Sequence, residues 1–407
     1  MPSYDFLILV GCGFQLFRVC RRRRSRTLSS SRERRISRLV SFLDRVQDDP
    51  LRLAHDLQAF SRDMGLLVPV VGKDVPKDVT TTSTLADATA AAAATKIHRH
   101  LRIQDNKNNN TNIPVVMAHG MGDSCFNSGM LSLTKYAAQL LGNGTCGTCV
   151  PTGDNQQEDA IHGHFKSMND NVDIFATKVK ADPRLSHAFY GIGLSQGNNV
   201  LRGYITKYND PPVLRFISIN GVNGGTGALP NCFPKLQLQD PAENVRSTTS
   251  WRSSICDLLE EQASKRAYSK FYQDHNFQAG YWRDPRPSEK QAYQTYSQLA
   301  QWNNEGSVIN ETYKANWALT DKFIWIKADR DEMVWPAEGE WFGAPDPTDP
   351  FNKDKILPTN ETEWYTRDLF GLKTAEEAGK NVYESFDGDH LQFTDDMFKQ
   401  WVTNYLT

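Results

Sequence analysis

The stretch HAFYGIGLSQGNNVLRGYITKY, residues 187–208, decides the fold of this chain. Its first half is a short apolar run that ends at glycines, which is typical of a buried parallel strand. Its second half carries apolar side chains at helical spacing, at Val200, Leu201, Tyr204 and Ile205. The sequence therefore predicts a strand that turns sharply into a helix.

The turn between these halves, Gly193-Leu-Ser195-Gln-Gly197, matches the pattern G-x-S-x-G. In a strand–turn–helix context this pattern indicates a nucleophile elbow, a tight turn that exposes a serine above the sheet. Glycines flank the serine because larger side chains would clash with the backbone that approaches on both sides. Ser195 is therefore the predicted nucleophile, against the alternative of a serine in an ordinary glycine turn.

Further short apolar runs surround this unit. They occupy residues 113–123, 213–221, 322–336 and 381–390, and a helix with Thr394 as its N-cap is expected over 394–405. Strands that alternate with helical stretches favour a parallel sheet. We therefore predict the α/β class, with a mostly parallel central sheet, helices on both faces and the α/β-hydrolase fold.

A serine hydroxyl needs a base within hydrogen-bond reach, and in this fold the base follows the serine in the chain. Only two histidines follow Ser195. His390 comes after the last expected strand and before the closing helix, where the base belongs. His275 lies in a polar helical stretch and is the weaker candidate. We predict His390 as the base.

The acid that orients the base should follow an earlier strand. The run that ends at Ala328 is followed by Asp329, Asp331 and Glu332. We prefer Asp331 and keep Asp329 as the alternative, with the unused acids as solvated loop carboxylates.

Negative charge that develops on the attacked oxygen requires two backbone N–H donors. The elbow supplies the N–H of Gln196, and the loop after the first strand supplies the N–H of Met121. His119 precedes the serine, so we expect it to fix this loop rather than to act as the base. Neither a metal nor a cofactor is predicted, because Cys146 and Cys149 have no second pair at ligand spacing.

Residues 232–310 interrupt the strand–helix alternation with an aromatic-rich helical segment. Such an insertion can form a cap with an apolar groove for an acyl chain. Most of its aromatic side chains are expected to form the core of the cap itself.

The first 112 residues differ in character from the catalytic region, 113–407. Ten arginines lie within residues 1–40, short amphipathic helices are expected within 35–66, and a Thr-, Ala- and Asn-rich linker follows. We expect a targeting or low-complexity extension that is largely disordered. The apolar run of residues 6–20 is too short to span a membrane, and arginines follow it rather than precede it, which is atypical for a signal peptide. No nucleic-acid partner and no stable membrane span are expected.

Cysteines and glycosylation sequons weakly favour the secretory pathway. Cys232 and Cys256 bracket a loop and could pair, which would require an oxidising compartment. Four sequons begin at Asn109, Asn143, Asn310 and Asn360.

With these residues assembled, the chain resembles the palmitoyl-protein thioesterase family over about residues 113–407. The resemblance rests on ordered stretches, several without a general role in the fold: HGMGDSC (119–125), GLSQG (193–197), NGVNGG (220–225), GALPNC (227–232), YWRDP (281–285), NETYK (310–314), EWFG (340–343), DLFGLK (368–373) and GDHLQF (388–393). The family commonly has Cys-Cys where this chain has Cys125-Phe126, and a second glycine where it has Asn198. The first departure leaves the pairing of Cys125 open.

This resemblance implies a lysosomal or secretory enzyme that removes long-chain acyl groups from S-palmitoylated proteins or peptides, or from thioesters such as palmitoyl-CoA. It implies Ser195, Asp331 and His390 as the triad, Met121 and Gln196 as oxyanion donors, and an acyl groove in the 232–310 insertion. A lipase or carboxylesterase that acts on oxygen esters is the alternative within hydrolases. An inactive lipid-binding protein anchored by its Arg-rich head is the alternative outside them.

Overall fold

The computed structural model describes residues 112–228, 263 and 265–407. The predicted N-terminal extension, apart from Asn112, and the proposed partners Cys232 and Cys256 lie outside these residues. Within 113–407, residues 229–262 and 264 are not described, and most of them belong to the insertion.

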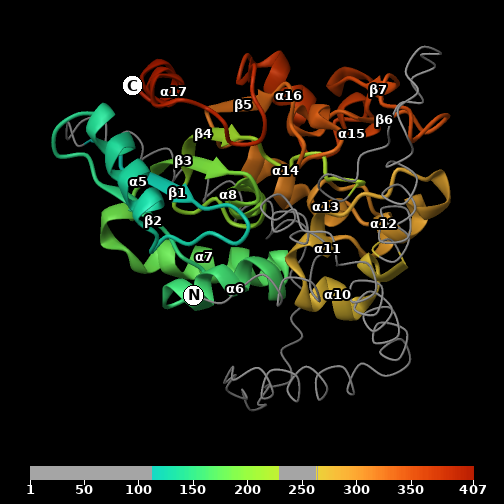
Figure 1. Ribbon diagram of the computed structural model, residues 1–407, viewed down its shortest axis with the longest axis horizontal. Coiled ribbons are helices and arrows are strands. Elements are labelled where there is room, and N and C mark those ends of the chain that lie inside the picture. Colours follow the sequence, from blue (N-terminus) through green and yellow to red (C-terminus); the bar gives the residue numbers. More distant parts are fainter. Residues whose placement is uncertain (1–111, 229–262, 264) are drawn as a thin grey trace, which may run out of the picture. The chain divides into compact units, whose positions relative to one another are not determined.

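The centre of the catalytic region is a six-stranded parallel sheet with strand order β2-β1-β3-β4-β5-β8 (Figure 1). The strands are β1 (Val115–Ala118), β2 (Gly147–Cys149), β3 (Phe189–Leu194), β4 (Val213–Ile219), β5 (Lys322–Ala328) and β8 (Asn381–Phe386). Every neighbouring pair is parallel. The predicted α/β class with a parallel central sheet is confirmed.

Side chains of successive strand residues point to opposite faces, and each face has its own apolar core. Val115 and Met117 pack on the face that helices α5 (Ser128–Leu140) and α17 (Asp395–Tyr405) cover. Val116 and Ala118 pack on the other face, against α7 (Met168–Ala181) and α8 (Gly197–Lys207). Burial on both faces explains why these strands are apolar throughout rather than alternating.

The remaining helices connect the strands or belong to the insertion. Those of the body are α6 (Gln156–Phe165), α14 (Glu311–Trp317), α15 (Glu363–Thr366) and α16 (Leu372–Glu377). Those of the insertion are α10 (Lys270–His275), α11 (Phe277–Tyr281), α12 (Lys290–Tyr296) and α13 (Gln298–Trp302). The described chain has four short 3₁₀ segments, which are η3 (Pro183–Leu185), η4 (Pro287–Glu289), η5 (Ala337–Trp341) and η6 (Thr359–Glu361). A two-stranded antiparallel pair of β6 (Ala344–Pro345) and β7 (Ile356–Leu357) lies between the last two in the chain.

Two sequence predictions differ from the observed elements. The strand expected over 322–336 ends at Ala328, because the charged run that begins at Asp329 leaves the sheet and forms a loop. The edge strand β2 was not predicted, since its three half-buried residues carry no apolar run. The closing helix does begin after Thr394, whose side chain accepts a hydrogen bond from the Met397 N–H.

Most of the described aromatic side chains of the insertion are buried, but fewer of them than predicted form a core of the insertion itself. Phe277, Tyr281 and Trp302 pack into the apolar core on the face of the sheet that α7 and α8 cover. Tyr268, Trp282 and Tyr293 form a separate, smaller apolar cluster within the insertion. In the described part of the chain, no helix has the length and apolar character needed to cross a membrane.

Candidate active site

Ser195 lies at the sharp turn between β3 and α8, with a left-handed backbone φ of 51°. A side chain on Gly193 would place its Cβ 2.2 Å from Asn198 Oδ1, and one on Gly197 would place it 2.3 Å from the Ala118 carbonyl oxygen. Both glycines are therefore required by close backbone approach, as the elbow pattern predicts.

His390 joins the serine to an acid from a different strand. Its Nε2 atom lies 2.8 Å from Ser195 Oγ, and its Nδ1 atom lies 2.5 Å from Asp331 Oδ2. The serine follows β3, the acid follows β5 and the histidine follows β8, so the carboxyl ends of three strands bring the three groups together. This is the hydrogen-bonded chain that a serine nucleophile requires.

Asp331 is the acid that reaches the histidine, and its other oxygen is held by its own loop. Oδ1 accepts hydrogen bonds from the Met333 and Val334 N–H groups, at 2.6 and 2.8 Å. Burial alone would raise the pKa of Asp331, but these bonds and the histidine outweigh it and leave the pKa below its ordinary value. The carboxyl group is therefore ionised at neutral pH.

The other candidate residues lie elsewhere. Asp329 forms an ion pair with Lys327 at 3.0 Å and accepts a hydrogen bond from Ser385. Glu332 donates its backbone N–H to Asp389. His275 is on α10, where its ring stacks on Phe271 and its Nδ1 atom contacts the Phe271 carbonyl oxygen.

The two predicted oxyanion donors lie on segments that meet at the serine. A Cβ placed on Gly120 would lie 3.2 Å from the Ser195 Cβ, so the loop that carries Met121 passes directly beside the nucleophile. Gln196 follows the serine at the start of α8. Within the described residues, neither the Met121 N–H nor the Gln196 N–H donates a hydrogen bond, which leaves both available for a substrate oxygen.

The side chain of Gln196 connects this site to the insertion. Its Oε1 atom accepts hydrogen bonds from Gln278 Nε2 at 2.6 Å and from the Tyr281 hydroxyl at 3.2 Å. Its Nε2 atom donates to the Gly163 carbonyl oxygen at 2.8 Å. Helix α11 of the insertion therefore holds the elbow residue in place.

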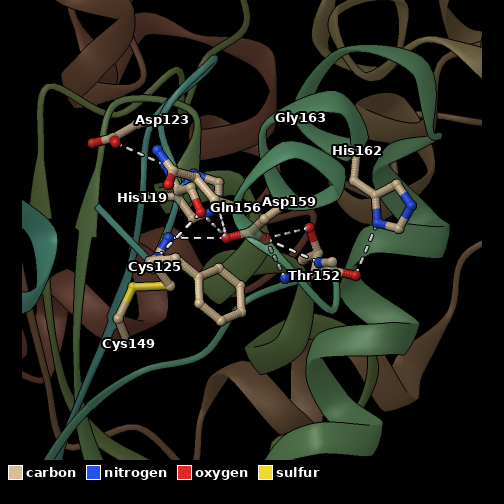
Figure 2. A network of polar contacts seen from close by, with 12 residues as sticks. His119, Asp123, Cys125, Cys149, Thr152, Gln156, Asp159, His162 and Gly163 are labelled. Carbon is tan, nitrogen blue, oxygen red and sulfur yellow. Dashed lines mark hydrogen bonds and ion pairs between the residues drawn. A yellow bond between two sulfur atoms is a disulfide. The ribbon is translucent and has the colours of Figure 1, made fainter. Parts of the chain in front are cut away.

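A buried carboxylate, Asp159 on α6, anchors the loop that carries Met121 (Figure 2). It accepts hydrogen bonds from the Ser124 hydroxyl and the Cys125 N–H, both at 2.9 Å, and from the Thr152 and Gly153 N–H groups at 2.7 and 3.0 Å. Asp159 thus joins the loop after β1 to the loop after β2.

His119 pairs with the same carboxylate. Its Nε2 atom lies 3.2 Å from Asp159 Oδ2, and its Nδ1 atom lies 2.9 Å from the Gly120 carbonyl oxygen. Burial lowers the pKa of His119, but the Asp159 hydrogen bond and charge outweigh it, so the pKa is raised. Both ring nitrogens face acceptors, which favours the imidazolium form. His119 therefore contacts the loop that it was expected to fix.

Cys125 forms a disulfide with Cys149, which joins the same loop to β2. The partner of Cys125, which the sequence left open, is therefore Cys149. His119, Cys125 and Asp159 bring potential metal ligands together. The donor set does not suit a metal, because the sulfur is held in the disulfide and the carboxylate already accepts hydrogen bonds from five other groups.

Asn198, where the family commonly has glycine, braces the elbow. Its side-chain amide donates to the Ser195 carbonyl oxygen at 2.9 Å and to the Ile219 carbonyl oxygen at 2.8 Å. Asn198 therefore helps to fix the backbone at Ser195.

Sequence reasoning missed three supporting residues: Asp159, Asn198 as a brace, and Gln278. Asp159 lies in a polar helix that resembles a solvated surface, and only the fold shows it to be buried. Gln278 lies 82 positions from its partner in the chain. No local pattern marks such long-range polar contacts.

The comparisons with known proteins agree with this geometry. The family model "Palmitoyl protein thioesterase" matches residues 114–390. Palmitoyl-protein thioesterase 1 of Caenorhabditis elegans is 32% identical over 280 residues, which are 69% of this chain and 87% of that protein. Palmitoyl-protein thioesterase 3 of Dictyostelium discoideum is 28% identical over 60% of this chain and 76% of its own length.

A further relative, the lysosomal thioesterase PPT2 of Mus musculus, is 26% identical over 64% of this chain and 76% of that protein. The residues that the family model matches include the elbow, the acid and the base. The chain belongs to the palmitoyl protein thioesterase family of α/β-hydrolases.

Proposed function

We propose that this chain hydrolyses long-chain fatty acyl thioesters on the cysteines of S-acylated proteins, with Ser195, His390 and Asp331 as the catalytic triad. The observation that carries the proposal is the hydrogen-bonded chain from Ser195 Oγ through His390 to Asp331, in a member of the thioesterase family. Palmitoyl-CoA-like thioesters are expected as small-molecule substrates.

In the first half-reaction, Ser195 Oγ attacks the thioester carbonyl carbon while His390 Nε2 takes the hydroxyl proton. The substrate oxygen becomes negative and is met by the N–H groups of Met121 and Gln196. When the C–S bond breaks, the departing thiolate receives the proton from His390. The products are a free cysteine and an acyl-serine.

In the second half-reaction, His390 removes a proton from water, and the resulting hydroxide attacks the acyl-serine. The oxyanion forms in the same place, and its collapse returns the proton to Ser195 and releases the fatty acid. Throughout, Asp331 keeps His390 in the required tautomer and stabilises its charged form.

We also propose that the insertion, residues 232–310, forms the acyl groove. Its α11 helix contacts Gln196 beside the serine, which supports this placement. The described chain also has a surface pocket of about 360 Å³ between α5 and β2. That pocket is lined by Leu131, Thr134 and Gly147 rather than by residues of the triad, so we do not assign the acyl chain to it.

The proposed organisation is an extension over residues 1–112 followed by the catalytic domain over 113–407. A lysosomal or secretory location is supported by the Cys125–Cys149 disulfide and by the exposure of the described sequon residues Asn143, Asn310 and Asn360.

Relative turnover of matched palmitoyl-thioester and palmitoyl-oxyester substrates tests the substrate class. We expect the thioester to be preferred, and a strong preference for the oxyester would instead assign the chain as a lipase or carboxylesterase. Labelling by a fluorophosphonate tests the nucleophile. Wild-type protein should be labelled and Ser195→Ala should not, whereas full activity in Ser195→Ala would exclude the triad.

A further inference from the structure

Three of the stretches that carry the family resemblance, NGVNGG, EWFG and GDHLQF, contact one another through hydrogen bonds, and the third contains His390 of the triad. Asn220, the first residue of one, donates from Nδ2 to Oε2 of Glu340, the first residue of the second, at 2.8 Å. Asn220 Oδ1 accepts the N–H of Leu391, next to His390 in the third, at 3.0 Å. One asparagine thus connects a buried glutamate to the loop of the catalytic histidine.

Glu340 lies on η5 and is fully buried. Its Oε2 atom accepts the Asn220 amide and, at 3.3 Å, the Ala328 N–H at the end of β5. Its other oxygen, Oε1, is buried and receives no hydrogen bond from a donor within the described residues. A side-chain interaction between the Glu340 and Asp331 carboxyl groups lowers the pKa of Asp331 and raises the pKa of Glu340.

Two neighbouring buried carboxyl groups cannot both be ionised without a compensating cation. Asp331 accepts hydrogen bonds from His390 and from two backbone N–H groups, which stabilise its charged form. The nearby cation Lys327, on β5, is paired with Asp329 at 3.0 Å. Burial and the charge of Asp331 raise the pKa of Glu340 well above its ordinary value. The proton therefore belongs on Glu340.

We propose that Glu340 is a positioning residue that remains a neutral carboxylic acid and donates a hydrogen bond to the ionised Asp331, while Asn220 fixes both Glu340 and the His390 loop. This inference rests on the proposed triad. Glu340 transfers no proton during the reaction, and its hydrogen bond spreads the negative charge of Asp331. The triad acid then stays ionised, and it holds the imidazolium less tightly than an isolated carboxylate would.

The protonation state can be measured without any substrate. Infrared spectra of Ser195→Ala protein should show the carbonyl band of a protonated carboxylic acid at neutral pH, and the band should disappear in Ser195→Ala/Glu340→Gln. A spectrum that does not change on this substitution would overturn the proposal. Because the measurement needs no activity, its result is independent of whether the proposed function is correct.

The pH profile of kcat/KM tests the effect on the triad, because its acidic limb reports protonation of the base. Glu340→Gln keeps a neutral donor of the same size, so the limb should stay within about 0.3 pH unit of wild type. Glu340→Leu removes the donor, and Asp331 then holds the histidine proton more tightly. The limb should move to higher pH by about 0.5–1 unit, with kcat lowered about tenfold.

A merely structural role gives a different pattern. If Glu340 only filled space, Glu340→Leu would lower stability or the amount of folded protein and leave the acidic limb in place. If Glu340 were ionised, Glu340→Gln would remove a negative charge and move the limb to lower pH. Either result would overturn the proposal.

Asn223→Ala is the matched control. Asn223 lies in the same glycine-rich stretch, is buried, and donates to the Glu340 backbone carbonyl oxygen at 2.8 Å, but does not contact the Glu340 carboxyl group through a hydrogen bond of the described chain. The substitution should lower stability without moving the acidic limb. A shift equal to that of Glu340→Leu would show that general loosening of this region moves the limb, and would overturn the specific role of the carboxyl group.

Discussion

Gln278 Nε2 lies 2.6 Å from Gln196 Oε1, which places a residue of the insertion in direct contact with a residue of the nucleophile elbow. Both side chains also donate to the Gly163 carbonyl oxygen. The insertion therefore contributes to the position of the Gln196 N–H as well as to the proposed acyl groove.

Replacement of Gln278 by alanine should lower kcat more than it raises KM. The Gln196 side chain would lose a hydrogen bond that holds it in place. The Gln196 backbone N–H would then donate to the transition-state oxygen with poorer geometry. We expect kcat to fall about tenfold, which is less than the loss of a whole oxyanion donor. Steady-state kinetics on a palmitoyl thioester measure this, with the exposed Gln291→Ala on α12 as a control. An effect on KM alone would place Gln278 in substrate binding instead.

Asp331→Asn should reduce kcat by about 10³–10⁴-fold and leave residual activity, because the histidine would adopt the wrong tautomer while the oxyanion donors remain. Asp329→Asn tests the alternative acid. It breaks only the partly exposed contacts with Lys327 and Ser385, so kcat should change by less than about threefold. The reverse order of effects would assign the acid to Asp329.

Asn198→Ala should destabilise the fold by about 1–3 kcal/mol, because it leaves the partly buried Ser195 carbonyl oxygen and the buried Ile219 carbonyl oxygen with fewer donors. Urea unfolding measures the change. Asn209→Ala provides a comparison, since this buried asparagine also donates to a backbone carbonyl but lies away from the elbow. Both should unfold at lower urea, whereas only Asn198→Ala should slow labelling by a fluorophosphonate. Equal labelling rates would show that Asn198 does not brace the nucleophile.

The ion pair of His119 and Asp159 predicts a defined pH dependence of stability. The pKa of His119 is raised in the folded state, so its contribution is fully present below the unfolded pKa of about 6.5 and is lost as pH rises through the folded pKa. The difference in Tm between wild type and His119→Gln should therefore be largest at pH 5–6 and smaller at pH 9. A difference that grows with pH would contradict the imidazolium assignment.

Removal of the Cys125–Cys149 disulfide should destabilise the protein by about 3 kcal/mol, because the bond closes a loop with a sequence separation of 24. Thermal unfolding of Cys125→Ala/Cys149→Ala, compared with wild type, measures this loss. Reducing agent should lower the Tm of wild type toward that of the double variant and leave the double variant unchanged. An equal response of both proteins to reductant would assign the effect to another cysteine pair.

The sequence by itself determined the class of the fold and the candidates for the reacting groups. Apolar strand runs ending in glycines predicted the parallel sheet, and the pattern around Ser195 predicted the elbow. The order of Ser195, Asp331 and His390 along the chain limited the base and the acid to very few candidates. These features are readable because strand periodicity and a tight turn impose local requirements on residue type.

Tertiary structure alone decided how those groups are held. The local sequence pattern favoured Asp331 as the acid but did not exclude Asp329, because both residues follow the same strand. Only the path of the loop shows which carboxylate reaches His390. Likewise, Asp159, Gln278 and Glu340 read as ordinary polar residues in the sequence. Each acts through partners that are distant in the chain, and burial gives these polar contacts their strength. That burial exists only once the sheet, its loops and the insertion have come together.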